Sequence, residues 1–428
     1  MYRGGTVGGL VHGGVWVRLT LLAVGSRGDV QPTLAVGREL ADGGQDVRIV
    51  THPTHERLCA LAGVPFFPLA EGPLAATKEV RTGRSWGRWR GHALVIWPAF
   101  AWDARAVVRE RLDQVLQASA GSDAIIASAA ATLLGWQTAD YFGIPLIRVA
   151  IDQPLRLVAL HGPLTRAARK AIWLWYRTWL NGARNDVGLP KLGTREPIGQ
   201  LEQRRVLWLR AYSPAVGPMP VASRDWVRAT GFWFIDRPVD PPPPPELVSF
   251  VDAGPPPLCI GFGGLELDDP RPMIRLAIGA LAGRRGVLVH HAFGKRGYEL
   301  PANVFGVGSV PHDWLLPRCA AVVHHCGSGT VGAALRAGAP TVPVPHAGFQ
   351  MRWARRLHEL GVATEPIPDR RLNVNNLRAG LTEATDDSGI RHRVAALQRV
   401  VAAERGTAKA RRLIEEYLDQ SCWTKRSA

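Results

Sequence analysis

The chain has 428 residues, of which 46% are hydrophobic and 21% charged, so it is too long for one ordinary core and too apolar for a disordered protein. Its apolar stretches, such as residues 93–102, fall well short of the roughly 20 residues that cross a bilayer, which argues against a membrane-spanning protein. The formal net charge is +16, but the excess is arginine scattered along the chain, so we expect no nucleic-acid partner.

The first half alternates strands and helices. Residues 1–16 are broken by glycines, lack the apolar core of an export signal and are expected to be a disordered extension. The apolar run 17–24 predicts a strand, followed by a glycine-containing loop at 25–29 and a helix over 33–42. Strands over 47–51, 124–128 and 146–151 and a helix over 132–141 repeat the unit, which predicts a parallel sheet covered on both faces.

Proline marks a boundary between two halves. Runs of five and three prolines favour extended backbone, so we predict a semi-rigid linker over 237–257 after an N-terminal domain over 17–236. The C-terminal domain, 258–428, repeats the alternation and ends in a helix over 391–418, which is able to pack back on the first domain. Its strands are expected at 258–262, 286–291, 303–307, 321–325 and 341–344.

The cysteines indicate a reducing compartment, which we take to be the cytoplasm. There are five, an odd number, and none forms a CxxC pair with metal-ligand spacing. The adjacent acidic pairs at 268–269 and 386–387 lie in turns and are better explained as solvated turn residues than as ligands. We therefore expect no bound metal and no cofactor.

The most informative segment is residues 322–345, VVHHCGSGTVGAALRAGAPTVPVP. A buried strand delivers His324 and His325 to its end, and a tight turn of small residues leads into a helix. Backbone N–H groups at such a turn approach a ligand closely, and the helix N-terminus adds partial positive charge. The arrangement suits a phosphate or diphosphate, although a structural turn would explain the glycines alone equally well.

The wider sequence resembles the family 1 glycosyltransferases, nucleotide-sugar-dependent enzymes of the GT-B fold. The resemblance lies in residues 310–345 and 353–357 (WARRL), in GFWFIDRP at 231–238 and in GPPPLCIGFGG at 254–264. GSRGDVQP at 25–32 resembles the amino-terminal motif of the sterol and glycopeptide-antibiotic (vancomycin-type) branch. The resemblance covers nearly all of residues 17–418. It implies an α/β protein with two Rossmann-like doubly wound parallel-sheet domains facing a cleft.

The resemblance also implies a set of donor-binding residues. His325 contacts the diphosphate, the following turn supplies backbone and hydroxyl donors, and the loop at Val310 faces the nucleotide base. Gly264 stands where the family commonly has serine, so one side-chain donor is missing there. The full set is His325, Gly327, Ser328, Gly329, Thr330, Gln350, Val310, Gly263 and Gly264.

Asp29 is the expected catalytic base. Inverting transfer needs a group that takes the acceptor's proton while the diphosphate leaves from the other side. Asp29 follows the first strand, and in the resembling branch this aspartate stands where other members place a catalytic histidine. The competing interpretation is that Asp29 caps the next helix or closes a turn against Gln31.

Phe349 is the main departure from the family pattern. The family usually has a carboxylate before the glutamine corresponding to Gln350, and the pair grips the donor sugar's hydroxyls. A phenyl ring accepts no hydrogen bond and leaves those hydroxyls unpaired. Three hypotheses stay open: a deoxygenated donor sugar, another group that substitutes, or weakened catalysis.

Tryptophan-rich segments are expected to bind the acceptor. Residues 84–102 and 171–180 place tryptophans between arginines, which suits a planar or lipid-like aglycone, with Trp86, Trp89 and Trp97 as the expected contacts. The competing interpretation is an amphipathic helix whose tryptophans face the core, and contact with a membrane surface is a further alternative.

We therefore predict an inverting glycosyltransferase that moves a sugar from a UDP- or dTDP-sugar to a hydroxyl of a hydrophobic natural product. Its partners are a nucleotide-sugar donor and a hydrophobic small-molecule acceptor. Two alternatives remain: a catalytically silent relative that serves as an auxiliary or binding protein, and an enzyme acting on a sterol or membrane lipid. An auxiliary or homodimeric partner is left open.

Overall fold

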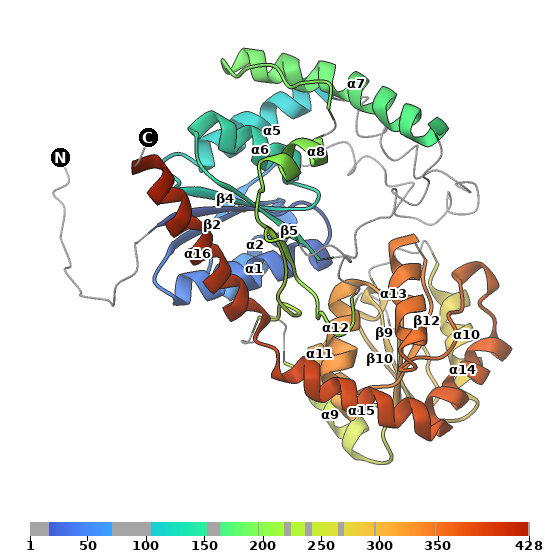
Figure 1. Ribbon diagram of the computed structural model, residues 1–428. Helices are drawn as coiled ribbons and strands as arrows, with labels where there is room; N and C mark the ends of the chain where they lie inside the picture. The colour runs from blue at the N-terminus through green and yellow to red at the C-terminus, as the bar shows by residue number, and fades with distance from the viewer. Residues whose placement is uncertain are drawn as a thin grey trace.

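The computed structural model describes residues 17–70, 104–151, 163–195, 197–217, 224–235, 242–263, 269–294, 297–346 and 348–426. They form two α/β domains, one above the other in Figure 1. Trp86, Trp89, Trp97 and Gly264 lie outside the described residues, so the predictions made for them are not addressed by the structure.

The N-terminal domain is built on a seven-stranded parallel sheet in the order β3-β2-β1-β4-β5-β6-β7. Its central strands β1, β4 and β5 are rich in Leu, Ile, Val and Ala and are buried on both faces, as expected for a parallel sheet between helical layers. The strands are β1 Arg18–Leu22, β2 Asp46–Thr51, β3 Phe66–Pro68, β4 Ala124–Ser128, β5 Leu146–Ala150, β6 Trp208–Arg210 and β7 Val227–Ala229.

Helices cover both faces of this sheet, and alternate strand residues face each layer. Leu21 and Ile126 pack toward α1, whereas Leu22 and Ile125 pack toward α5, α6 and α7. The helices of this domain are α1 Arg27–Asp42, α2 Glu56–Ala62, α5 Ala104–Ala118, α6 Thr132–Phe142, α7 Pro163–Asp186 and α8 Pro197–Gln203.

The C-terminal domain has a five-stranded parallel sheet in the order β10-β9-β8-β11-β12. In each sheet the strand order switches sides next to the first strand, between β1 and β4 and between β8 and β11, and open α/β folds bind ligands at the carboxyl ends beside such a switch point. The strands are β8 Leu258–Gly261, β9 Gly286–Val289, β10 Val304–Val307, β11 Ala321–His324 and β12 Thr341–Pro343. The helices are α9 Pro245–Asp252, α10 Arg271–Leu281, α11 His312–Leu315, α12 Ser328–Ala337, α13 Gly348–Glu359, α14 Val374–Asp386, α15 Ser388–Ala403 and α16 Gly406–Arg426.

The predicted linker is wrong for residues 245–252, which form α9. The helix begins at Pro245 because proline fits the first helical position, where no backbone donor is needed. Leu247 and Val251 on this helix are buried against Val287 of the C-terminal sheet. α9 is therefore part of the C-terminal domain, and the linker is shorter than its proline content indicates.

The predicted last helix, 391–418, is two helices. α15 ends at Ala403, Glu404 adopts extended backbone, and α16 begins at Gly406. A Cβ on Gly406 would lie 2.3 Å from the backbone oxygen of Phe232, so the chain turns where only glycine allows this approach.

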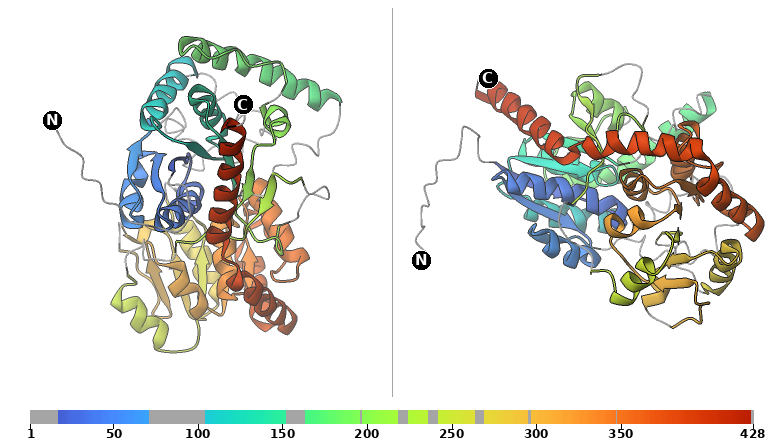
Figure 2. Two further views of the ribbon diagram at one scale, coloured as in Figure 1. Left: turned by 60° about the vertical axis from the view of Figure 1, so that its left-hand side comes forward. Right: turned by 90° about the horizontal axis from the view of Figure 1, so that it is seen from below.

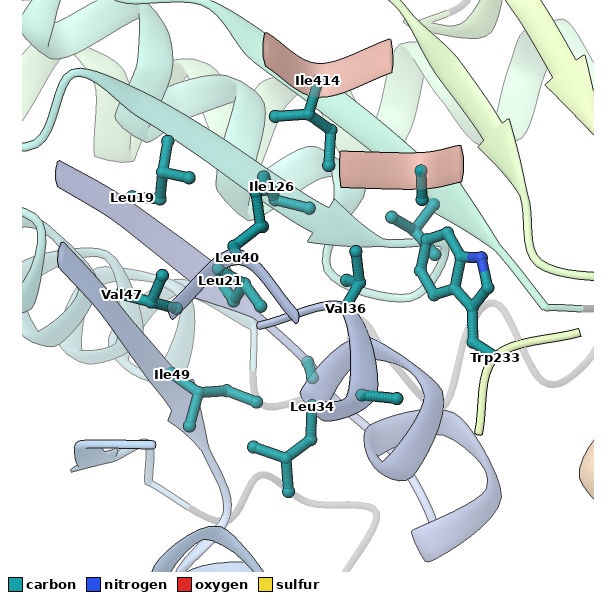
Figure 3. Packing of buried hydrophobic residues seen from close by; sticks show 14 of the residues in the cluster. Leu19, Leu21, Leu34, Val36, Leu40, Val47, Ile49, Ile126, Trp233 and Ile414 are labelled. Carbon is teal, nitrogen blue, oxygen red and sulfur yellow. The ribbon is translucent and has the colours of Figure 1, made fainter. Parts of the chain in front are cut away.

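α16 joins the core of the N-terminal domain. Ala410, Ile414 and Leu418 pack in the same cluster as Leu19 and Leu40 (Figure 3). In Figure 2, α16 runs from the C-terminal domain along the N-terminal one. The end of the chain thus ties the two domains together.

A hydrophobic cluster made of residues from both domains also lies between them. Phe232, from the segment after β7, packs on Trp353 of α13, and a Cβ on Gly332 of α12 would lie 2.7 Å from the Phe232 ring. Ser213 donates a hydrogen bond to Glu404 at 2.6 Å. These contacts hold the carboxyl ends of the two sheets toward each other.

Among the described residues, no helix combines the length and the apolar character needed to cross a membrane.

Candidate functional site

The turn after β11 is fixed by His324. Its ring is buried, and Nδ1 accepts a hydrogen bond from the Cys326 N–H at 3.0 Å. Burial lowers the pKa of His324 to about 3, so the ring is neutral and Nδ1 stays an acceptor. Cys326 has a φ of 62°, a left-handed conformation that costs a non-glycine residue about 1–2 kcal/mol and that this bond helps to hold.

Cys326 is a packing residue. The side chain is fully buried beside Val331 and Trp353, and burial raises the pKa of its thiol. A thiol that resists ionisation is a poor nucleophile. Its environment gives no support to a catalytic role.

His325, the next residue, stands between two glycines. A Cβ on Gly263 would lie 2.6 Å from its Cε1 and Nδ1, and a Cβ on Gly327 would lie 2.5 Å from its Nε2. The ring therefore fits only because both neighbours lack side chains. Nδ1 is buried without a hydrogen-bond partner in the part of the chain that the structure describes. Burial lowers the pKa of His325 to about 4, so the ring is neutral at pH 7.

α12 begins directly after this ring. Its N-cap is Gly327, which has no side chain to bond the first N–H groups, and a Cβ on Gly329 would meet nothing within 4 Å. Uncapped N–H groups facing open space attract an anion. The Ser328 hydroxyl, however, donates to the Ile151 carbonyl of the N-terminal domain at 2.5 Å. The predicted donor-binding hydroxyl thus bridges the domains in this structure.

Asp29 lies in the first turn of α1, which begins at Arg27 rather than at the predicted residue 33. Its Oδ2 accepts hydrogen bonds from both the N–H and the hydroxyl of Ser26, each at 2.8 Å. The helix-capping role weighed against catalysis is therefore real. No hydrogen bond engages Oδ1 within the described residues, so capping uses only one of the two oxygens.

The surroundings of Asp29 make it a stronger base. Burial raises its pKa, against the opposing influence of the Ser26 hydrogen bonds and the nearby His55. His55 Nε2 lies 3.1 Å from the Gly25 carbonyl, and a Cβ on Gly25 would lie 2.4 Å from Asp29 Oδ2. Gly25, with a φ of 131°, thus lies against both side chains.

Of the other predicted donor residues, Thr330 lies in the first turn of α12, Val310 follows β10 and Gln350 lies in the first turn of α13. Val310 is 4% exposed and packs on Leu315, so only its backbone can face a ligand. Gln350 Oε1 accepts a hydrogen bond from the His346 N–H at 2.8 Å. Phe349 is 38% exposed at the start of α13.

His346 and Asp369 form a pair that the sequence did not predict. His346 Nδ1 lies 3.6 Å from Asp369 Oδ2, although 23 positions separate the two residues. No sequence motif predicts this pair, because the contact depends on where the chain after β12 returns to the sheet.

One predicted acceptor segment is partly described. Trp173 on α7 is buried in the core and Trp175 is 41% exposed. The core interpretation holds for the first of these tryptophans, and the second is available at the surface.

Comparison with known proteins identifies the chain's relatives. Residues 19–139 match the profile described as glycosyltransferase family 28 N-terminal domain, and residues 286–416 match the erythromycin biosynthesis protein CIII-like C-terminal domain. An O-mycaminosyltylonolide 6-deoxyallosyltransferase of Streptomyces fradiae is 33% identical over 94% of this chain and 98% of its own length. A sterol 3-beta-glucosyltransferase of Arabidopsis thaliana is 30% identical over 92% of this chain and 67% of its own length.

Solved structures show the same fold. The glycosyltransferase of kitacinnamycin superposes with a TM-score of 0.74 at 20% identity, covering 94% of this chain and all of that one. The glycosyltransferase VinC, solved in complex with dTDP, gives a TM-score of 0.65 at 19% identity, again over 94% of this chain and all of the other. The sequence resemblance and the predicted fold class are thereby confirmed: the chain is a family 1 glycosyltransferase of the GT-B fold, related to antibiotic and sterol glycosyltransferases.

Proposed function

We propose that this enzyme transfers a sugar from a UDP- or dTDP-sugar to a hydroxyl of a hydrophobic small molecule, with inversion at the anomeric carbon. The observation that carries the proposal is the buried, unpartnered Nδ1 of His325 beside the uncapped end of α12. A neutral imidazole donates one hydrogen bond, and the helix end offers several more without a metal ion. Together they suit a diphosphate that gains negative charge as it leaves.

Asp29 is assigned as the base. Its Oδ2 is held by Ser26, which fixes the carboxylate and leaves Oδ1 to take the proton from the acceptor hydroxyl. The acceptor oxygen then forms its bond to the anomeric carbon as the bond from that carbon to the diphosphate oxygen breaks. The electron pair of the broken bond stays on the diphosphate, where His325 and α12 stabilise it.

The acceptor class is inferred from the relatives. One is named for transfer to O-mycaminosyltylonolide and several for transfer to sterols. These named transferases favour an active enzyme over a silent binding protein. An antibiotic macrolactone is our first choice, because that relative matches over nearly its whole length.

A transfer assay tests this function. The purified protein is incubated with UDP-glucose or dTDP-glucose and, in separate reactions, a macrolactone aglycone or ergosterol, and products are identified by mass spectrometry. We expect a glycoside of one acceptor and release of one equivalent of nucleoside diphosphate. Binding of the nucleotides without transfer or hydrolysis, across both donors and a wider set of deoxysugar donors, would instead support the silent-relative alternative.

A further inference from the structure

A second histidine near the donor site has an unused ring nitrogen. His346 follows β12, and its side chain is 9% exposed. Its Nε2 is fully buried and has no hydrogen-bond partner among the described residues. Buried polar atoms are nearly always paired in native proteins. An unpaired one close to a ligand-binding turn indicates the position of a ligand atom.

Asp369 and Phe262 hold the ring in place. Asp369, in the short 3-10 helix Asp369–Arg371, places Oδ2 3.6 Å from His346 Nδ1. Its own N–H donates to the Pro345 carbonyl at 3.4 Å, and its Oδ1 accepts from the Arg370 N–H at 2.6 Å. Phe262, just after β8, meets the imidazole edge-on at a centroid distance of 6.3 Å. The ring is thus oriented with Nδ1 toward the carboxylate.

This orientation determines the chemistry of Nε2. Burial lowers the pKa of His346, and Asp369 opposes that effect only in part, so the ring is neutral at pH 7. Because the carboxylate faces Nδ1, we assign the ring proton to Nδ1. Nε2 then carries a lone pair and accepts a hydrogen bond.

His346 lies close to the proposed diphosphate site. Phe262, which meets the His346 ring, is followed by Gly263, whose Cβ would lie 2.6 Å from the His325 ring. A proton on His346 would disfavour a proton on His325, which adds to the effect of burial in lowering the pKa of His325. The backbone N–H of His346 also donates a hydrogen bond to the side chain of Gln350, the one member retained from the family's sugar-binding pair. The other member is replaced by Phe349, which cannot accept a hydrogen bond. An acceptor is therefore missing at position 349 and present, unused, at position 346.

We propose that His346 Nε2 accepts a hydrogen bond from a hydroxyl of the donor sugar and so substitutes for the carboxylate that Phe349 replaces. This inference rests on the proposed function, because it assumes a nucleotide-sugar at the β11–α12 turn. His346 would determine sugar specificity, and Asp369 would be a positioning residue that fixes its tautomer. Of the three hypotheses raised by Phe349, this geometry supports substitution by another group.

Calorimetric titration separates the sugar contact from the diphosphate contact. UDP, dTDP, UDP-glucose and dTDP-glucose are titrated into the wild-type protein, His346→Leu and, as a matched control at an exposed histidine, His392→Leu. We expect His346→Leu to weaken binding of the nucleotide-sugar by roughly 10- to 100-fold. Binding of the free diphosphate should change by less than about two-fold, and the control should match the wild type.

Asp369→Asn provides a milder variant, since that carboxylate is 40% exposed and its replacement leaves the core intact. An asparagine amide that donates to Nδ1 moves the ring proton to Nε2 and turns the acceptor into a donor. We expect a selective loss of roughly 3- to 10-fold for the nucleotide-sugar. In the His346→Leu background the same change should add nothing, which a merely structural role would not predict.

Monodeoxy analogues of the glucose unit identify the hydroxyl. For the analogue that lacks the bonded hydroxyl, the wild type should lose its advantage over His346→Leu. Equal weakening of diphosphate and nucleotide-sugar binding in His346→Leu would overturn the proposal, as would an advantage that persists with every analogue. If the wild type binds none of the four nucleotides, the proposed function fails first, and this inference fails with it.

Discussion

The carboxyl ends of β11 and β1 have the same strand-turn-helix topology, but their polar side chains differ in whether they have hydrogen-bond partners. At β11, His325 is buried between two glycines with a ring nitrogen left over, and α12 starts without a cap. At β1, Asp29 caps the first turn of α1 through Oδ2, and Oδ1 accepts no hydrogen bond from the described residues. The proposed donor end therefore contains a buried group without a hydrogen-bond partner in the described structure, whereas the carboxylate at the proposed base end is already held by Ser26.

The largest expected effect comes from breaking the β1 end alone. Asp29→Asn keeps an oxygen for Ser26 but cannot take a proton, so kcat should fall by roughly 10²- to 10⁴-fold. The dissociation constant of the nucleoside diphosphate should stay within about two-fold of the wild-type value. Steady-state kinetics and calorimetry check this, with Asp42→Asn at the exposed end of α1 as the control. A fall of less than ten-fold would remove Asp29 from the role of base.

Lowering the pH should change folding stability in opposite directions through the groups at the two ends. The pKa of His324 is lowered to about 3 from 6.5, so the unfolded chain binds this proton more readily and stability falls as the pH drops below 6.5. Between pH 7 and pH 5 this ring alone should cost on the order of 2 kcal/mol. The pKa of Asp29 is raised, so protonation at that end favours the folded state. Urea unfolding at both pH values, compared for wild type, His324→Asn and the control His392→Asn, measures the difference. Only His324→Asn should reduce the loss in acid.

Gly263→Ala should damage the donor end without touching the base. Gly263 has a φ of 75°, and the new Cβ would lie 2.6 Å from the His325 ring. We expect diphosphate binding to weaken by about 1–3 kcal/mol. Gly193→Ala is the matched control, because its Cβ meets nothing within 4 Å and its φ is not positive. Unchanged binding in Gly263→Ala would show that the His325 ring can move freely, which would contradict its close packing against Gly263.

Ser328→Ala sharpens the comparison with a smaller effect. It removes the hydrogen bond to Ile151 between the domains, which should cost about 1 kcal/mol of unfolding free energy. If the hydroxyl serves mainly as this bridge, diphosphate binding should change by less than about two-fold. A loss of binding without a loss of stability would return Ser328 to the donor-binding role expected from the resemblance.

Patterns within a short stretch of sequence were predicted well, and contacts between distant stretches were not. Strands such as 124–128 were located correctly because unbroken β-branched and apolar runs leave few other structures. α1 begins six residues before the predicted start at 33, because the helix continues through Pro32, which usually marks a helix boundary. α9 was not predicted because the prolines around it favour extended backbone. The break before α16 depends on the close contact between Gly406 and the backbone of Phe232.

The site divides in the same way. His325 and the turn at Ser328 follow from a local strand-turn-helix pattern and a family resemblance. The partner of Ser328 is in the other domain, and the pairing of His346 with Asp369 crosses a loop and a 3-10 helix. Such contacts depend on tertiary packing, and no spacing in the sequence encodes them.

We propose above all that the β11–α12 turn binds the donor diphosphate through His325. Calorimetric titration of UDP and dTDP into the wild type, His325→Ala and the control His392→Ala tests it most directly. We predict that one nucleotide binds, that His325→Ala weakens it by roughly 1–3 kcal/mol and that the control changes nothing. Equal affinity in the wild type and His325→Ala would place the diphosphate elsewhere and contradict this account.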